Sequence, residues 1–314
     1  MEIRKDVRDM GLKKDAQKII ASAIRSALPD TAVKKALEGW DLSGGKLLLI
    51  SIGKAAWFMA KAACDILGNQ IDDGIVITKY DHSKGKLPSL RVYEAGHPIP
   101  DKNSFKATEQ VVKLVSDLSS KDKVLFLISG GGSALFEKPL VSKPALEDLT
   151  NKLLASGADI VEMNTIRKRL SAVKGGKFAK LCEPAQVFSV VLSDIIGDPL
   201  DMIASGPAYP DSSTCDQALE IIRKYNLIVS DEVLKLLNIE TPYDIRNVKT
   251  KITGSVTQLC EAAKKTCEDL GYEPIILTAN LNCEAREAGR FLSSIAQYHN
   301  NTEKSPAFIA GGET

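Results

Sequence analysis

The chain has 314 residues, 44% of them hydrophobic and 26% charged, the composition of an ordinary globular protein long enough for two domains. Its 41 basic and 40 acidic residues leave a net charge of +1, which argues against a nucleic-acid-binding or membrane-binding surface. No apolar run approaches the ~20 residues of a membrane span, the amino terminus lacks a signal-peptide core, and the six cysteines form no C-x-x-C pair. We therefore expect a cytoplasmic protein without structural zinc.

Helix and strand patterns alternate along most of the chain. Apolar residues at helical spacing, followed by short continuous apolar runs, are typical of helices packed on strands that are buried on both faces. The elements expected before residue 193 are helices over residues 12–28, 34–37, 55–68, 103–118, 146–156 and 164–181, the last interrupted by Gly175-Gly176, and strands over 46–52, 73–78, 90–95, 124–128 and 186–192. This alternation predicts a large Rossmann-like α/β/α domain with a mostly parallel sheet.

A second, smaller α/β domain is expected in the last part of the chain. Residues 231–247 are polar, weakly patterned and contain Pro242, so we assign residues 1–240 to the large domain and 241–314 to the second. The elements expected there are strands over residues 248–252, 273–278 and 307–310 and helices over 255–270 and 283–298. The sequence stops at Gly311-Gly-Glu-Thr314, directly after a strand, so we expect this domain to be truncated.

Four loops that follow predicted strands, at residues 53–54, 96–101, 129–133 and 193–207, are expected to form one site. Ligands of open parallel sheets bind outside the carboxyl ends of the strands. Because those ends meet at one edge of the sheet, most of these loops should lie close together.

The strongest candidate for anion binding is the loop Ser129-Gly130-Gly131-Gly132-Ser133, which follows a buried strand. Successive glycines allow positive φ and let main-chain N–H groups approach phosphate oxygens. Leu135 replaces the third glycine of the dinucleotide fingerprint G-x-G-x-x-G, and no Gly-Lys pair is followed by Ser or Thr as in a P-loop. A nucleotide site here would be of another kind, and a tight turn without a ligand is the alternative.

Charged residues near these loops are further candidates. Lys54 lies between a strand and a helix, where an ammonium can accompany bound phosphates, although most lysines of this chain are expected to be ordinary surface residues. Asp194 follows another strand and could accept a proton from a substrate hydroxyl or bind magnesium. Asp198 could join it as a metal ligand, or serve the turn before Pro199.

Three polar residues of the predicted helix over 164–181 could bind a substrate. Spacings of three and seven place Asn164, Arg167 and Lys174 near one helical face, which could hold a carboxylate or phosphate or could be a solvated basic face. We add His97 as a substrate-binding candidate, because its loop follows a strand and no two histidines have metal-ligand spacing.

The sequence resembles the glycerate 2-kinases of the MOFRL type, a family earlier labelled hydroxypyruvate reductases. The likeness rests on motifs spread over nearly the whole chain: Gly53-Lys-Ala-Ala56, Gly96-His-Pro-Ile-Pro-Asp101, Ser129-Gly-Gly-Gly-Ser-Ala-Leu135, Asn164-Thr-Ile-Arg-Lys-Arg-Leu-Ser171, Lys174-Gly-Gly176, Ser193-Asp-Ile-Ile-Gly-Asp198, Ala204-Ser-Gly-Pro207 and Gly311-Gly-Glu-Thr314. The resemblance implies ATP-dependent phosphorylation of D-glycerate at its 2-hydroxyl, with Mg²⁺, in a cleft between two α/β domains.

The same resemblance assigns roles to individual residues. The lysine proposed as catalytic in the family falls on Lys54, the aspartates of its Ser-Asp motif fall on Asp194 and Asp198, and its glycine loop falls on residues 130–132. The family's second domain continues past Gly-Gly-Glu-Thr into a segment with an arginine and a Gly-Gly-Arg-Asn-Gln-Glu pattern, which these 314 residues do not contain.

Two other functions stay open at this point. The first is an NAD(P)H-dependent hydroxypyruvate reductase, which the missing dinucleotide fingerprint argues against. The second is a non-catalytic protein that binds a phosphorylated metabolite through the glycine loop. We expect small molecules, ATP and D-glycerate, as the partners, and leave a homodimer open.

Overall fold

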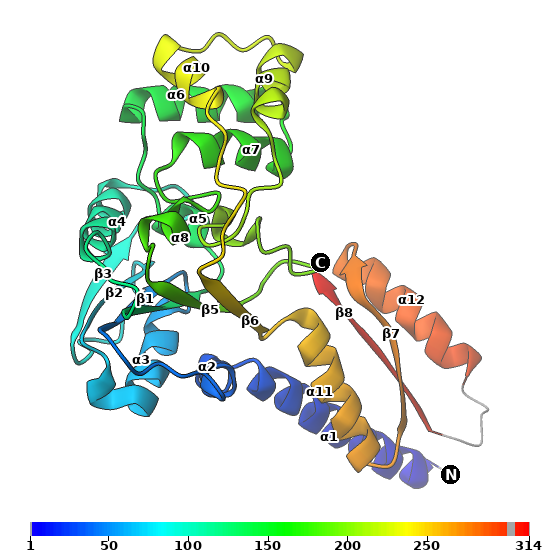
Figure 1. Cartoon of the computed structure of the whole chain (residues 1–314). Coiled ribbons are helices and arrows are strands. Elements are labelled where there is room, and N and C mark those ends of the chain that lie inside the picture. Colours follow the sequence, from blue (N-terminus) through cyan, green and yellow to red (C-terminus); the bar gives the residue numbers. More distant parts are fainter. Residues whose placement is uncertain (1, 300–304, 314) are drawn as a thin grey trace. The chain divides into compact units, whose positions relative to one another are not determined.

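The computed structural model describes residues 2–299 and 305–313, which form two compact units (Figure 1). The sheet unit consists of Ala36–Val191 and Pro199–Lys251. The small unit consists of the described parts of Met1–Lys35, Leu192–Asp198 and Ile252–Thr314. Neither unit is continuous in sequence, and the expected boundary near residue 240 falls inside the sheet unit.

A six-stranded sheet is the centre of the sheet unit. Its strands are β1 (Leu47–Ile52), β2 (Asp73–Lys79), β3 (Leu90–Ala95), β4 (Lys123–Ile128), β5 (Gln186–Leu192) and β6 (Val248–Thr253), in the spatial order β3-β2-β1-β4-β5-β6. The pairs β1–β2, β2–β3, β1–β4 and β4–β5 are parallel, which confirms the predicted sheet. In this register Ile52 is opposite both Ile77 and Ile128, so the chain leaves β1, β2 and β4 at the same edge.

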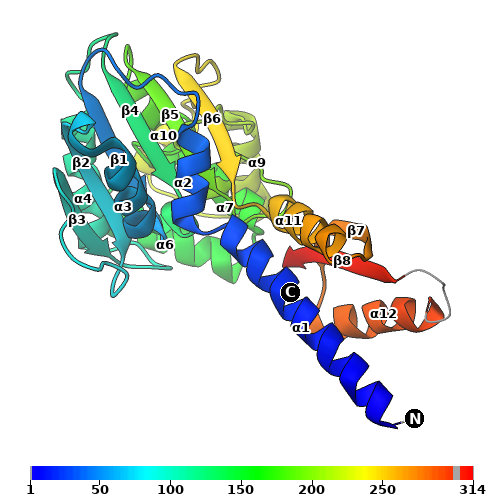
Figure 2. The same cartoon turned by 90° about the horizontal axis from the view of Figure 1, so that it is seen from below.

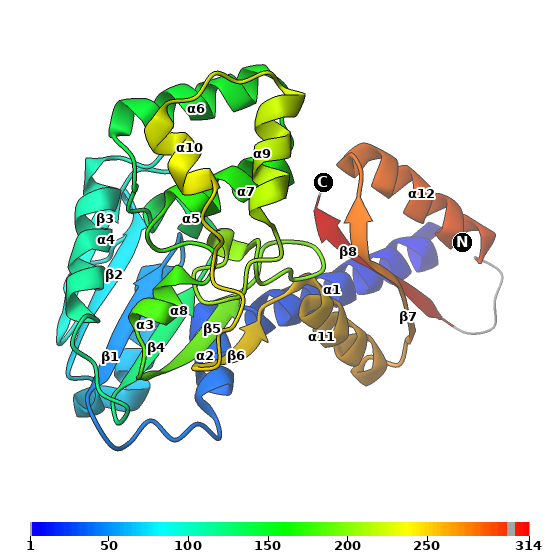
Figure 3. The same ribbon diagram turned by 45° about the horizontal axis from the view of Figure 1, so that its top comes forward.

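Helices cover both faces of this sheet, as Figures 2 and 3 show. One face packs against α3 (Ala56–Leu67), and the other against α4 (Lys102–Leu114), the short α5 (Gly132–Leu135) and α8 (Lys177–Leu181). On that second face Phe126 of β4 packs against Phe136 and Phe178, with ring centroids 5.9 and 4.6 Å away. Every residue of β1 is buried, because helices cover the central strands on both sides.

A separate helical layer belongs to the same unit. It consists of α6 (Lys143–Ala155), α7 (Ile160–Leu170), α9 (Cys215–Lys224) and α10 (Asp231–Leu237), which share a core of aliphatic side chains that includes Leu149, Ile166, Ile221 and Leu237. Each helix starts at a capping side chain: Ser142, Asp159, Thr214 and Ser230 respectively. Neither α9 nor α10 was predicted from the sequence, although Ala218, Ile221 and Ile222 of α9 have helical spacing.

The small unit contains two parallel strands, β7 (Glu273–Asn282) and β8 (Pro306–Glu313), with α11 (Val256–Asp269) and α12 (Ala285–Tyr298). The long helix α1 (Glu2–Ser26) packs against α11, where the hydroxyls of Thr266 and Ser22 are 2.8 Å apart. The predicted smaller α/β part is therefore confirmed. Among the described residues, no helix combines the length and the hydropathy that crossing a membrane requires.

Candidate active site

The glycine loop and the turn after β1 are joined by main-chain hydrogen bonds at the carboxyl edge of the sheet. The N–H of Lys54 donates to the carbonyl of Gly130 (2.8 Å), and the N–H of Ala55 donates to the Ser129 hydroxyl (3.1 Å). Gly53 has a φ of +112°, and a Cβ on it would lie 2.3 Å from Ser129 Oγ. Only glycine therefore allows the two segments to approach this closely.

Lys54 and His97 both lie beside Gly131. This glycine has a φ of +85°, and a Cβ built on it would lie 2.9 Å from His97 Cδ2 and 3.3 Å from Lys54 Cγ. The structure thus brings together the lysine, the histidine and the loop that the sequence analysis placed at one edge. The Lys54 side chain is exposed, while its carbonyl is 3.0 Å from the Nδ1 atom of His82.

The last residue of the Gly96-His-Pro-Ile-Pro-Asp101 motif has a structural role. The Asp101 carboxylate accepts hydrogen bonds from the N–H groups of Asn103 and Ser104 and caps α4. It also accepts a hydrogen bond from the Tyr80 hydroxyl at 2.6 Å. Desolvation alone would raise the pKa of Asp101, but these hydrogen bonds outweigh it and lower that pKa. The motif therefore fixes the segment that carries His97.

Asn164, Arg167 and Lys174 also converge on the loop, though not for the reason predicted. The helix predicted over 164–181 is two helices, because α7 ends at Leu170, before the expected interruption at Gly175-Gly176, and Lys174 lies in the turn before α8. Even so, Arg167 Nη2 and Lys174 Nζ both donate to the Ser133 carbonyl, at 3.2 and 2.7 Å. Tertiary contacts, and not helical spacing, bring these residues together.

A buried charge cluster supports the loop from beneath. Lys174 Nζ lies 3.2 Å from Glu137 Oε2 and donates to the Phe136 carbonyl at 2.9 Å, and Arg167 Nη2 lies 4.0 Å from the same carboxylate. Burial lowers the pKa of Lys174 to about 8, although Glu137 partly opposes the shift. With the bond to Ser133, the Lys174 ammonium has enough acceptors for all its donors, so the geometry favours loop anchoring over the direct substrate contact we predicted.

The two residues between Arg167 and Leu170 belong to a second cluster. Lys168 Nζ is 2.9 Å from Asp211, and Arg169 Nη2 is 3.2 Å from Glu240. These pairs join α7 to the segments around α9 and α10. They stabilise the helical layer and do not contact the glycine loop.

Ser205 is a site residue that the sequence analysis did not select. Its hydroxyl lies 2.9 Å from the Ser133 hydroxyl and donates to Asn164 Oδ1 at 3.0 Å. Ser205 is fully buried, and Asn164 is 5% exposed. Its sequence signals were the run of small residues, Ser205 to Pro207, in the long segment after β5, and the motif Ala204-Ser-Gly-Pro207 of the family resemblance.

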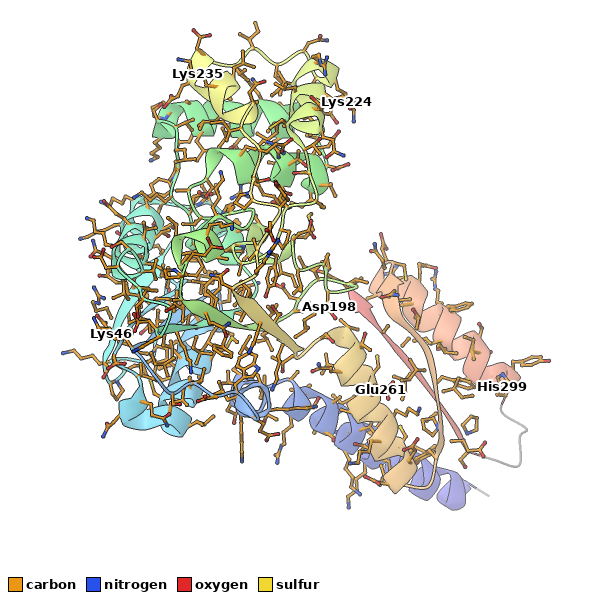
Figure 4. The ribbon with its side chains drawn as sticks, in the orientation of Figure 1. Lys46, Asp198, Lys224, Lys235, Glu261 and His299 are labelled. Atoms are coloured by element: carbon orange, nitrogen blue, oxygen red, sulfur yellow. The ribbon has the colours of Figure 1, made fainter. Side chains whose placement is uncertain are left out.

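Asp194 and Asp198 belong to the small unit, in the segment Leu192–Asp198. Asp194 is exposed, and Asp198, labelled in Figure 4, has a φ of +53° in a turn where its N–H donates to the Ile195 carbonyl at 3.1 Å. No group of three or more His, Cys, Asp or Glu side chains in the described residues could hold a metal. The carboxylates of the exposed Asp194 and the half-buried Asp198 nevertheless fit Mg²⁺, which binds through one or two carboxylates and keeps waters or substrate phosphates as its other ligands.

Fold and site together define the class, an open-sheet α/β protein whose glycine loop, lysine and histidine gather at the carboxyl edge of the strands. A family described as a domain of unknown function (DUF4147) matches residues 15–238. The D-glycerate 2-kinase of Thermotoga maritima is 48% identical over 309 residues, which cover 96% of this chain and 74% of that protein. The glycerate 2-kinase of Pyrococcus horikoshii is 37% identical, over 99% of this chain and 75% of its own length.

Solved structures give the same result. The crystal structure of glycerate kinase from Thermotoga maritima superimposes with a TM-score of 0.91 at 47% identity, covering 97% of this chain and 75% of the other. The chain therefore belongs to the glycerate 2-kinase family, as the sequence resemblance implied.

Proposed function

We propose that this protein phosphorylates D-glycerate at its 2-hydroxyl, with ATP as the phosphoryl donor. The observation that carries the proposal is the 48% identity to a D-glycerate 2-kinase, together with the placement of Lys54 and His97 against the glycine loop. A hydroxypyruvate reductase is not favoured, because the loop lacks the dinucleotide fingerprint and both of these relatives are named kinases.

Phosphoryl transfer requires alignment and charge neutralisation more than covalent help from the protein. In our proposal the main-chain N–H groups of Gly130 to Ser133 bind ATP phosphates, since the N–H of Ser129 donates to the Ile52 carbonyl. The exposed ammonium of Lys54 supplies the counter-charge. Arg167, Asn164 and His97 are the candidates for binding the carboxylate and hydroxyl groups of D-glycerate.

Asp194 and Asp198 are the metal ligands in this proposal. Their carboxylates would hold Mg²⁺, which when bound neutralises charge on the phosphates. Asp194 has the alternative role of the base that accepts the proton of the reacting hydroxyl. Its exposure leaves the carboxylate accessible for either role.

A coupled ATP assay with D-glycerate, with the product identified by phosphorus NMR, tests the proposal. We expect 2-phosphoglycerate as the product, and a loss of kcat of about a hundredfold or more in Lys54→Ala, because one charge at a phosphoryl group contributes that much. Lys61→Ala is the control, since Lys61 is an exposed lysine of α3 that pairs with Asp65. NADH oxidation with hydroxypyruvate and no ADP formation would contradict the kinase assignment.

A further inference from the structure

Ser205 lies in a run of left-handed backbone. Ala204, Ser205 and Gly206 have φ values of +53°, +60° and +62°, and only the last is a glycine. Residues with side chains avoid this conformation, and it persists where the surrounding contacts determine it and the arrangement has a use.

The contacts that hold this run come from the glycine loop and from the two glycines that follow Lys174. The N–H groups of Gly175 and Gly176 donate to the carbonyls of Ser205 and Gly206, at 3.0 and 2.7 Å. On the other side, a Cβ on Gly132 would lie 2.6 Å from the Cβ of Ala204. The strained run is therefore packed directly against the loop that we propose binds phosphate.

The direction of the hydrogen bonds at Ser205 follows from elementary chemistry. Asn164 Oδ1 can only accept, so Ser205 donates its proton to it. Ser205 Oγ must then accept the hydrogen bond from the Ser133 hydroxyl, 2.9 Å away. With its proton directed toward Ser205, Ser133 Oγ presents lone pairs to its surroundings and acts there as an acceptor.

Ser133 Oγ, as an acceptor, suits a substrate hydroxyl that donates a hydrogen bond. The chain of hydroxyls ends on an amide oxygen, which does not take up a proton at neutral pH, so it cannot remove a proton from a reacting hydroxyl. Ser133 Oγ can, however, accept a hydrogen bond from a substrate hydroxyl that keeps its proton throughout the reaction.

We propose that Ser205 is a positioning residue that fixes Ser133 Oγ as the acceptor for the substrate hydroxyl that is not phosphorylated. The site thereby selects hydroxy acids that carry a second hydroxyl. This inference rests on the proposed phosphorylation of D-glycerate, in which the second hydroxyl is the one on carbon 3.

The test compares D-glycerate with D-lactate, which lacks only the 3-hydroxyl, in the wild type and in Ser205→Ala. We expect the wild type to prefer D-glycerate by at least about a hundredfold in kcat/KM. In Ser205→Ala we expect kcat/KM for D-glycerate to fall by about tenfold or more. The values for D-lactate and the KM for ATP should change by less than about twofold. An equal loss of kcat/KM for both acids would leave the preference for D-glycerate unchanged and would overturn the inference.

Ser189→Ala is the matched control. Ser189 is also fully buried, and its hydroxyl lies 2.6 Å from the Tyr209 hydroxyl, outside the loop contacts. It should lower the melting temperature about as much as Ser205→Ala and leave the preference between the two acids intact.

Calorimetric binding measurements separate a failure of the proposed function from a failure of the inference about Ser205. If the wild type turns over neither acid, the proposed function fails, and the affinities of D-glycerate and D-lactate then test Ser205 directly. A preference for D-glycerate that disappears in Ser205→Ala supports the inference. Equal affinities in the wild type contradict it.

Discussion

At the scale of single residues, tertiary contacts decide which charged side chains lie beside the glycine loop and which support it from beneath. Lys54 and His97 are beside the glycine loop as expected, because both follow strands of one parallel sheet. Lys174 was selected as a basic side chain for a substrate, yet its ammonium is fully buried against Glu137 and two carbonyls. Burial and acceptor geometry depend on tertiary contacts, so neither this role nor the selection of Ser205 could be predicted from sequence spacing.

The pKa of Lys174 predicts how pH acts on the loop. Since burial lowers it from 10.5 to about 8, the unfolded chain binds more protons than the folded protein between these values, and stability rises with pH there. The full penalty for burying the charge is present below pH 8. The cationic anchor beneath Ser133 is lost above it, so we expect the KM for ATP to rise by about fivefold between pH 7 and pH 9, as measured by initial rates. A KM that is flat over this range would contradict the anchoring role.

Glu137→Gln tests the same cluster by removing its carboxylate charge. Because Glu137 raises the pKa of Lys174, the variant should move the rise in KM to lower pH, by about one unit. It should also lower the free energy of unfolding by about 3 kcal/mol or more, since Lys174 keeps a buried charge without its partner. Asp148→Asn is the control, because Asp148 pairs with Lys152 at the surface and should cost less than about 1 kcal/mol. Urea denaturation and pH-dependent kinetics measure both effects.

At the scale of elements, the buried strands were predictable and the helical layer was less so. A continuous apolar run bounded by turns has few alternatives to a buried strand, which is why β1, β2, β4 and β5 were predicted within about two residues of their bounds. α9 and α10 were missed because they are short, 10 and 7 residues, and follow a long polar segment without regular patterns. The loop 129–133 was selected for its glycines, and the structure supplies the reason for Gly131, a left-handed residue against His97 and Lys54.

Comparing Gly131→Ala with Gly157→Ala separates backbone strain from the loss of the close approach between Gly131 and His97. The Gly131→Ala variant must adopt a φ of +85° and place a Cβ 2.9 Å from His97 Cδ2. Gly157→Ala is the control, because Gly157 has a φ of +77° with no atom within 4 Å of its Cβ position. Both should lose about 1–2 kcal/mol of stability from strain, but only Gly131→Ala should lose about tenfold or more of kcat/KM. Equal activity in the two variants would show that the close approach has no catalytic consequence.

At the scale of the whole molecule, the sequence predicted the two α/β parts but not how the chain is divided between them. Composition reveals only local boundaries, whereas the chain passes between the units near residues 35, 191, 198 and 251. As a result, the glycine loop, Lys54 and the loop anchors belong to the sheet unit, and Asp194 and Asp198 belong to the small unit. The proposed ATP-binding loop and the proposed Mg²⁺ ligands therefore come from different units of the chain.

The dependence of thermal stability on magnesium tests whether Asp194 and Asp198 bind the metal. A ligand at a hundred times its Kd stabilises the folded state by about 2.7 kcal/mol, which raises the melting temperature by several degrees. We expect ATP alone to give part of this shift and Mg²⁺ to increase it. Asp194→Asn with Asp198→Asn should remove only the magnesium-dependent part, because the loop and Lys54 remain intact. The control is Asp269→Asn, an exposed aspartate of α11 in the same unit. If the magnesium-dependent shift survives in the double variant, these aspartates are not its ligands, and the metal site must be sought elsewhere in the protein.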